Sequence, residues 1–67
     1  MIIKIQTEFI RLDALLKLAN VAQTGGQAKW MIQDGTVSVN GESCTMRGKK
    51  IRSGDMVTVS DQTITVE

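Results

Sequence analysis

The segment Thr24–Gly41, TGGQAKWMIQDGTVSVNG, carries the strongest local signals in this 67-residue chain. Thr24 and Gln27 have the spacing of a capping box, in which side chains satisfy backbone groups that the first helical turn leaves unpaired. A helix is therefore expected to begin after Thr24. Gly35 stands where a left-handed residue commonly ends a helix, because glycine adopts positive φ without a Cβ clash.

The residues after this helix predict a β-hairpin. Residues 36–39, TVSV, alternate polar and apolar side chains as a half-buried strand does. Asn40-Gly41 is a strong signal for a type I′ turn, so Glu42–Met46 is expected to return as the partner strand. Cys44, within that return strand, is expected to pack as a small hydrophobe.

A second helix and its packing face are predicted from apolar periodicity. The helix is expected to start at Leu12, and its apolar residues fall on one face: Leu12, Leu15, Leu16 and Ala19. On the helix after Thr24, the face expected to pack against it contains Ala28, Met31 and Ile32. The opposite face contains Gly26, Lys29, Trp30 and Gln33. Burial and exposure of Trp30 are both left open by the sequence.

Short strands are predicted at both ends of the chain. Residues 2–5 form an extended apolar run near the N-terminus. Residues 56–59 and 63–66 follow a turn at 53–55 and alternate as two antiparallel strands. The element order predicts a single α+β domain over residues 1–67, with two packed helices followed by a small antiparallel sheet of hairpins.

Composition argues against several classes of activity. The chain has one cysteine and no histidine, so it lacks the residues for an internal disulfide, a usual zinc site or a Cys–His nucleophile. The seven carboxylates are scattered, and no pair has a spacing that indicates acid–base catalysis. We therefore expect no enzyme activity, no cofactor and no metal.

Neither a membrane span nor a signal peptide is indicated. No apolar run approaches the roughly 20 residues that cross a bilayer. The N-terminal residues MIIKIQTEF lack the apolar core and cleavage site of a signal peptide. We expect no membrane partner, and a cytoplasmic location is the default expectation.

Basic residues are clustered although the net charge is only +1. Four of the eight basic residues fall within six positions that contain no acid: Arg47, Lys49, Lys50 and Arg52. Clustering of this kind favours a polyanionic partner more than the total charge does. A solvated loop between strands would produce the same pattern, so the cluster alone does not decide between the two interpretations.

Several short motifs occur in a fixed order along the chain. They are IRLD at 10–13, I-x-x-G-x-V-x-VNG at 32–41 and GD-x-V at 54–57. In this order they resemble the S4 RNA-binding domain, and the resemblance covers about residues 10 to 60. The words TGGQAK at 24–29 and RGKKIR at 47–52 are similar to short stand-alone bacterial S4-like proteins of the YaaA/YbcJ type.

The resemblance implies a helix pair with its adjoining turn, the αL motif, that docks on structured RNA without catalysing a reaction. The implied partners are rRNA or tRNA and the ribosome or ribosome-associated proteins, with no small-molecule substrate. With one tryptophan, one phenylalanine and no tyrosine, recognition is expected through RNA shape and phosphates. The residues expected at the RNA are Arg11, Lys17, Thr24, Gly25, Gly26, Gln27, Lys29, Trp30, Gln33, Arg47, Lys49, Lys50 and Arg52.

One departure from the family pattern keeps an alternative open. Many S4 domains begin the second helix with Ser-Arg, whereas this chain has Gly26-Gln27 and so lacks that cation. Lys29 and the cluster at 47–52 are candidates to replace the charge. The alternative is a protein-interaction module on an S4 scaffold, because a fold does not fix a function.

Overall fold

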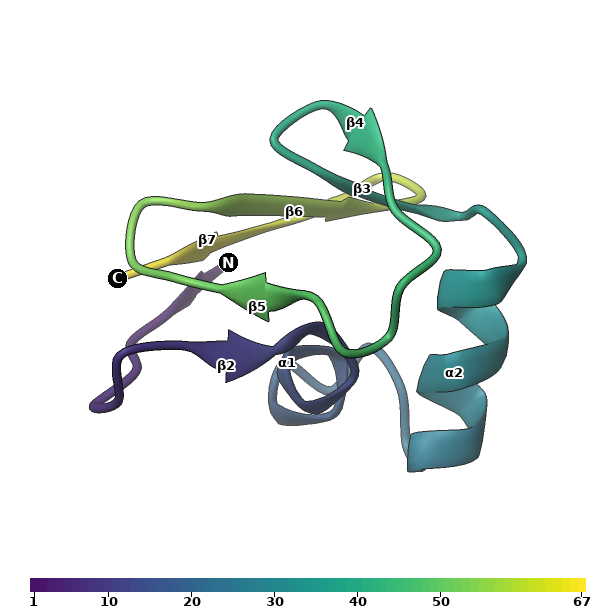
Figure 1. The fold of residues 1–67 in the computed structure, drawn as a ribbon, viewed down its shortest axis with the longest axis horizontal. Coiled ribbons are helices and arrows are strands. Elements are labelled where there is room, and N and C mark those ends of the chain that lie inside the picture. Colours follow the sequence, from purple (N-terminus) through teal and green to yellow (C-terminus); the bar gives the residue numbers. More distant parts are fainter.

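A five-stranded sheet packs over two helices, and a separate two-stranded ribbon lies beside them (Figure 1). The structure is a computed structural model that describes all of residues 1–67. In chain order the elements are β1 (Ile2–Ile3), β2 (Ile10–Arg11), α1 (Leu12–Leu18), α2 (Gly25–Gln33), β3 (Val37–Val39), β4 (Glu42–Ser43), β5 (Lys50–Ile51), β6 (Met56–Val59) and β7 (Gln62–Val66).

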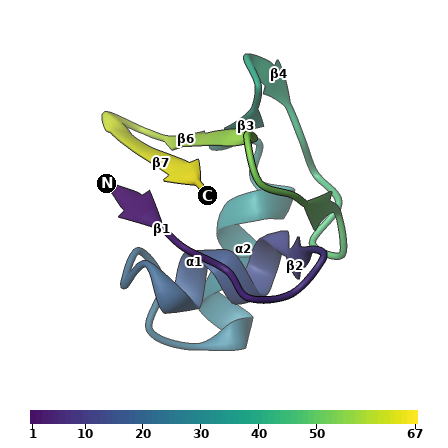
Figure 2. The ribbon, with the colours of Figure 1, turned by 90° about the vertical axis from the view of Figure 1, so that its left-hand side faces the viewer.

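The larger sheet has the strand order β1-β7-β6-β3-β4. Its hairpins β3–β4 and β6–β7, and the pair β3–β6, are antiparallel. Strand β1 instead runs parallel to β7, with Ile2 opposite Thr65 and Ile3 opposite Val66. The predicted α+β fold with two packed helices is confirmed, but the sheet is mixed rather than wholly antiparallel. Figure 2 shows β1 and β7 on one side of the domain and the β2 end on the other.

The core lies between the inner face of the sheet and the two helices. All fourteen buried residues are apolar, and no buried side-chain polar atom lacks a hydrogen-bond partner. Each predicted apolar face contributes to this core: Leu12, Leu15, Leu16 and Ala19 from the first helix and its end, Ala28 and Ile32 from α2, and Val57, Val59, Ile64 and Val66 from the strands. Such uniform apolar burial is the main favourable term for a domain of this size.

The local signals around α2 act as the sequence predicts. The Thr24 hydroxyl accepts a hydrogen bond from Gln27 N at 3.0 Å, which caps the helix. The Gln27 side chain reaches back one residue further than a standard capping box and accepts from Gln23 N at 2.9 Å. Gly35 has a φ of 86° after the helix, and Asn40 and Gly41 have φ values of 52° and 86°, as a type I′ turn requires.

The return strand of the first hairpin is shorter than the predicted Glu42–Met46. It pairs only through Glu42–Ser43, with one further bond from Cys44 N to Val37 O at 2.9 Å. Beyond Cys44 the chain leaves the sheet and crosses to the start of α1, where its carbonyls accept hydrogen bonds. Cys44 is half-buried against the core, which agrees with its predicted packing.

Both helices are short. Helix α1 has 7 residues and α2 has 9, and neither is long and apolar enough to cross a membrane.

Candidate nucleic-acid interface

The segment Arg47–Arg52, which we call the basic loop, is fixed to the first turn of α1. Leu12 N donates a hydrogen bond to Lys49 O at 2.9 Å, and Asp13 N donates to Arg47 O at 3.1 Å. The first N–H groups of a helix have no partner within the helix, and Arg11 at the cap position provides no side-chain cap. The backbone of the basic loop therefore serves as the cap of α1. Its four cationic side chains are left exposed to solvent.

A second constraint comes from the ribbon formed by β2 and β5. Ile10 pairs with Ile51, and Arg11 pairs with Lys50. Ile51 is fully buried, and successive side chains of a strand point to opposite faces, so Lys50 points outward. Arg11, directly across from it, is exposed as well. Like charges placed opposite each other on two strands repel, and an anion bound between them would relieve that repulsion.

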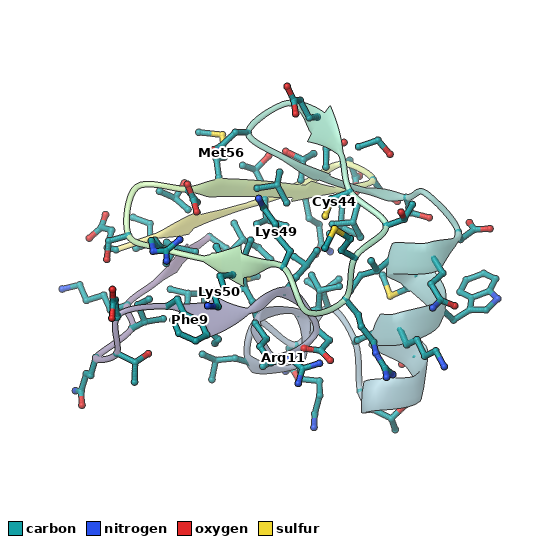
Figure 3. The ribbon with its side chains drawn as sticks, viewed as in Figure 1. Phe9, Arg11, Cys44, Lys49, Lys50 and Met56 are labelled. Carbon is teal, nitrogen blue, oxygen red and sulfur yellow. The ribbon has the colours of Figure 1, made fainter.

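The cations of this ribbon are supported by their neighbours. Lys50 Nζ lies 4.9 Å from the centroid of the Phe9 ring, a cation–π contact that restrains the lysine (Figure 3). The Arg11 guanidinium is 3.3 Å from Asp13 Oδ2, and a Cβ added at Gly48 would lie 3.8 Å from Arg11 Nη2. Arg11 therefore extends over the backbone of the basic loop. Arginine has five N–H donors, so one long contact leaves it able to bind phosphate.

A groove of about 740 Å³ separates the basic loop from the β3–β4 hairpin. Figure 3 shows Lys49 and Cys44 on this side of the molecule. Its lining combines three cations with polar side chains and two acids: Lys49, Lys50, Arg52, Asn40, Ser43, Ser53, Glu42 and Asp55, among others.

One of the two acids in the groove is engaged in holding the structure together. Asp55 Oδ2 accepts a hydrogen bond from Arg52 N at 2.8 Å, and Asp55 Oδ1 accepts from Asn40 Nδ2 at 3.1 Å. Asn40 Oδ1 in turn accepts from Met56 N at 2.9 Å. The Arg52 hydrogen bond, then the Asn40 bond and the positive charges of Lys49 and Arg52, hold the pKa of Asp55 below its usual value of 3.8. Asp55 therefore remains ionised and fixes the end of the basic loop.

Helix α2 presents the second group of predicted residues. Lys29, Trp30 and Gln33 are exposed on the side away from the core, as the periodicity predicts, and Trp30 is 66% exposed. Gly25 has no atom within 4 Å of the place where a Cβ would stand, and Gly26 has only the Thr24 hydroxyl at 3.9 Å. Each position therefore has room for a Cβ, and packing does not require glycine there.

The structure divides the predicted site into two groups. One contains Arg11 and the basic loop, which hydrogen bonds and strand pairing bring together at the start of α1. The other is the exposed face and start of α2. The Thr24 hydroxyl oxygen and Gln27 Oε1 each accept a capping hydrogen bond, so both side chains have a structural role at the start of α2. Lys17 belongs to neither group, because it lies in the last turn of α1, at the opposite end of that helix from Arg11.

Sequence reasoning missed the residues that position the cations. Phe9 beneath Lys50, Asp13 beside Arg11, and the Asn40–Asp55 bridge were not predicted. Asn40 carries a clear turn signal, but its link to Asp55 depends on the tertiary arrangement of two turns far apart in the sequence.

Comparison with known proteins places this geometry in a family. The profile of the S4 domain matches residues 3–67. The chain belongs to the S4 domain family. This membership confirms the resemblance drawn from the motifs at 10–13, 32–41 and 54–57.

The S4 domain has a similar relative in Bacillus subtilis (strain 168), described as a probable ribosome maturation protein RlbA. The two are 47% identical over 57 residues, which cover 85% of this chain and 80% of the relative. The similarity to short stand-alone S4 proteins is therefore confirmed.

The S4 domain is also similar to part of a solved enzyme. The crystal structure of a pseudouridylate synthase superposes with a TM-score of 0.75 and 30% sequence identity. The match covers 84% of this chain but only 24% of that one. The shared part is the S4 fold, and the activity in the enzyme's name is a property of that protein.

Proposed function

We propose that this S4 domain is a non-catalytic RNA-binding module of the cytoplasm that recognises structured RNA, either rRNA or tRNA, in association with ribosomes. The observation that carries the proposal is the attachment of the basic loop to α1 through its backbone. Because Arg47 O and Lys49 O accept the helix N–H groups, the cationic side chains have no structural duty in that attachment. The relative named as a probable ribosome maturation protein supports the ribosomal setting.

The charges in this region are available for phosphate. The one ion pair in the structure joins Arg11 to Asp13, and the four cations of the basic loop make none. Cations arranged around a helix start favour the phosphate backbone, which supplies affinity without sequence reading. With no histidine and no cluster of potential metal ligands, the residues offer no constellation for catalysis.

The test is a titration of ribosomal RNA with the protein over a series of salt concentrations. Affinity should fall by roughly 0.7–0.9 log units per log unit of salt for each phosphate neutralised. The double variant Lys49→Glu/Lys50→Glu should bind much more weakly and lower that slope by about 1.4–1.8, because two phosphate contacts are lost.

A charge reversal outside the basic loop separates local contact from net charge. Lys4 follows β1, at the far edge of the sheet from β4, and Lys4→Glu should leave the slope nearly unchanged. Lys50→Glu alone should also keep the fold, because it places an acid opposite Arg11. The proposal would be contradicted by tight binding whose affinity does not fall with salt and is not weakened by either variant of the loop.

A protein-interaction module on the S4 scaffold is the second candidate function. The observation in its favour is a row across the outer face of the sheet, in which Ile2, Thr65 and Met56 are neighbours. Ile2 is 61% exposed and Met56 is 46% exposed. Pull-down from cells before and after nuclease treatment discriminates the two functions, since partners held by protein contacts survive the nuclease.

A further inference from the structure

Trp30 is the only tryptophan, and it stands apart from the apolar side chains of its helix. It is 66% exposed, whereas Ala28 and Ile32 are fully buried and Met31 packs against the core. Most of this aromatic surface is in water, so it adds little to the packing of α2 against the rest of the domain. The ring is free to contact a partner outside the chain.

The surroundings of Trp30 leave its ring accessible. Gly26 lies four residues before Trp30 on the same side of α2, and no atom of the indole comes within 4 Å of where a Gly26 Cβ would stand. Gly26 has no side chain to cover the ring, and only the Thr24 hydroxyl comes within 4 Å of where its Cβ would be. Lys29 and Gln33, both exposed, stand on the same side of α2.

These neighbours fit a nucleobase better than a protein surface. A protein hot spot is normally ringed by other groups that exclude water, and α2 exposes no second large apolar side chain. A single ring beside a lysine and an amide instead offers stacking, phosphate attraction and hydrogen bonding to one base. Asp34, four residues after Trp30, is the acid nearest to the tryptophan along the chain. Its carboxylate accepts a hydrogen bond from the Thr36 hydroxyl at 3.1 Å.

We propose that the exposed indole of Trp30 stacks on an unpaired nucleobase of the bound RNA, with Lys29 and Gln33 beside it. The inference rests on the proposed RNA-binding function and adds a specificity to it. The basic loop attracts the phosphates of any RNA, while Trp30 selects RNA in which a base is unstacked, as in a bulge or a loop. The ligand of this helix face is therefore an extruded base and not a paired helix.

The chain offers a direct optical test, because all tryptophan fluorescence comes from position 30. Two RNA hairpins are compared at low salt: one fully paired, and the same hairpin with one unpaired adenine in its stem. The hairpin with the unpaired adenine should quench the fluorescence and bind more tightly. Trp30→Leu should lose roughly 5- to 150-fold in affinity for that hairpin, the range for removing one stacked base, and should no longer distinguish the two RNAs.

Two controls limit the interpretation. Trp30→Phe keeps an aromatic ring and should retain most of the preference. A merely hydrophobic role would give Trp30→Leu and Trp30→Phe the same preference. Ile2→Ala removes an apolar side chain of similar exposure, 61%, on the edge strand β1 and should change neither affinity.

The outcomes separate this inference from the function on which it rests. Salt-dependent binding of both hairpins with no quenching and no effect of Trp30→Leu would overturn the stacking and leave RNA binding intact. A Trp30→Leu variant that binds both hairpins normally but loses a protein partner would assign the indole to a protein contact and overturn it too. Absence of binding to either hairpin and to ribosomal RNA would overturn both proposals.

Discussion

Replacing Asp55 with alanine removes the carboxylate that ties the end of the basic loop to the β3–β4 hairpin. The side chain accepts hydrogen bonds from Arg52 N at 2.8 Å and from Asn40 Nδ2 at 3.1 Å. Without it, both donors lose their partner, and the Asn40 side chain keeps only the bond that its Oδ1 accepts from Met56 N. The turn at Gly54, with a φ of 95°, would keep its backbone bond from Asp55 N to Arg52 O at 3.0 Å but lose the bond that the carboxylate accepts from Arg52 N.

The magnitude follows from the type and exposure of these bonds. Hydrogen bonds to a charged group contribute about 1.5–3 kcal/mol when well shielded. Asp55 is only partly buried, so we expect about 1.5–3 kcal/mol for the two bonds together. A domain of this length is stable by roughly 3–10 kcal/mol, and each kcal/mol shifts Tm by roughly 4–8 °C. Asp55→Ala should therefore lower Tm by roughly 6–24 °C.

Asp55→Asn is the sharper variant, because it keeps the shape of the side chain. Its amide has one oxygen and one NH₂ group, whereas the site presents two N–H donors, from Arg52 and Asn40. Either orientation of the amide therefore leaves a donor facing a donor. We expect Asp55→Asn to be nearly as destabilising as Asp55→Ala.

The effect should depend on pH in a defined direction. The pKa of Asp55 is lowered in the folded state, so its carboxylate contributes stability above its unfolded pKa and loses that contribution as pH falls through the folded pKa. The difference between wild type and Asp55→Asn should be complete above about pH 5 and shrink progressively below about pH 4.

Urea unfolding followed by the fluorescence of Trp30, at several pH values, measures these differences. Asp61, exposed in the β6–β7 turn, provides the matched control, and Asp61→Asn should change stability by less than about 0.5 kcal/mol. If both Asp55 variants stayed within about 0.5 kcal/mol of wild type at pH 7, the bridge would not fix the loop as we infer.

Other substitutions test the caps, the glycines and the ribbon. Thr24→Ala should cost about 1 kcal/mol in urea unfolding, because the hydroxyl caps Gln27 N at 3.0 Å, and Thr24→Ser should cost much less. Gly26→Ala should raise stability by about 0.5–1 kcal/mol, since a Cβ meets no closer atom than 3.9 Å, yet it should weaken RNA binding if phosphate approaches this turn closely. Ile51→Ala should cost about 2–5 kcal/mol, because the fully buried Ile51 anchors the β2–β5 ribbon, with calorimetry as the readout.

Local signals were sufficient to predict the two helices and the turns of the two hairpins, though not the length of β4. The cap at Thr24, the left-handed Gly35 and the Asn40-Gly41 turn each act on neighbours a few residues away, so the sequence contains both partners. The inward alternation of β6 and β7 could be predicted for the same reason.

Pairings between distant segments could not be predicted in this way. Strand β1 has two residues and pairs with β7 at the other end of the chain, and neither strand contains a signal for the other. The β2–β5 ribbon is equally short, and its register depends on burying Ile51. Short apolar runs indicate extended structure but do not specify a partner.

The candidate site was likewise predictable where local sequence decides it and not where distant segments do. Its cations stand out in composition, but the bonds that place them use the backbone carbonyls of Arg47 and Lys49, which every residue possesses. The position of Trp30 off the packing face was predictable, while its exposure depended on whether another segment would cover it, and none does.

Ultraviolet crosslinking in growing cells, with each crosslink mapped to both the protein residue and the RNA position, tests the central claim most directly. We expect crosslinks from Arg11, the basic loop and the exposed face of α2 to a limited set of positions in rRNA or tRNA. Crosslinks concentrated on the outer face of the sheet, around Ile2 and Met56, or an absence of RNA crosslinks with abundant protein ones, would contradict it.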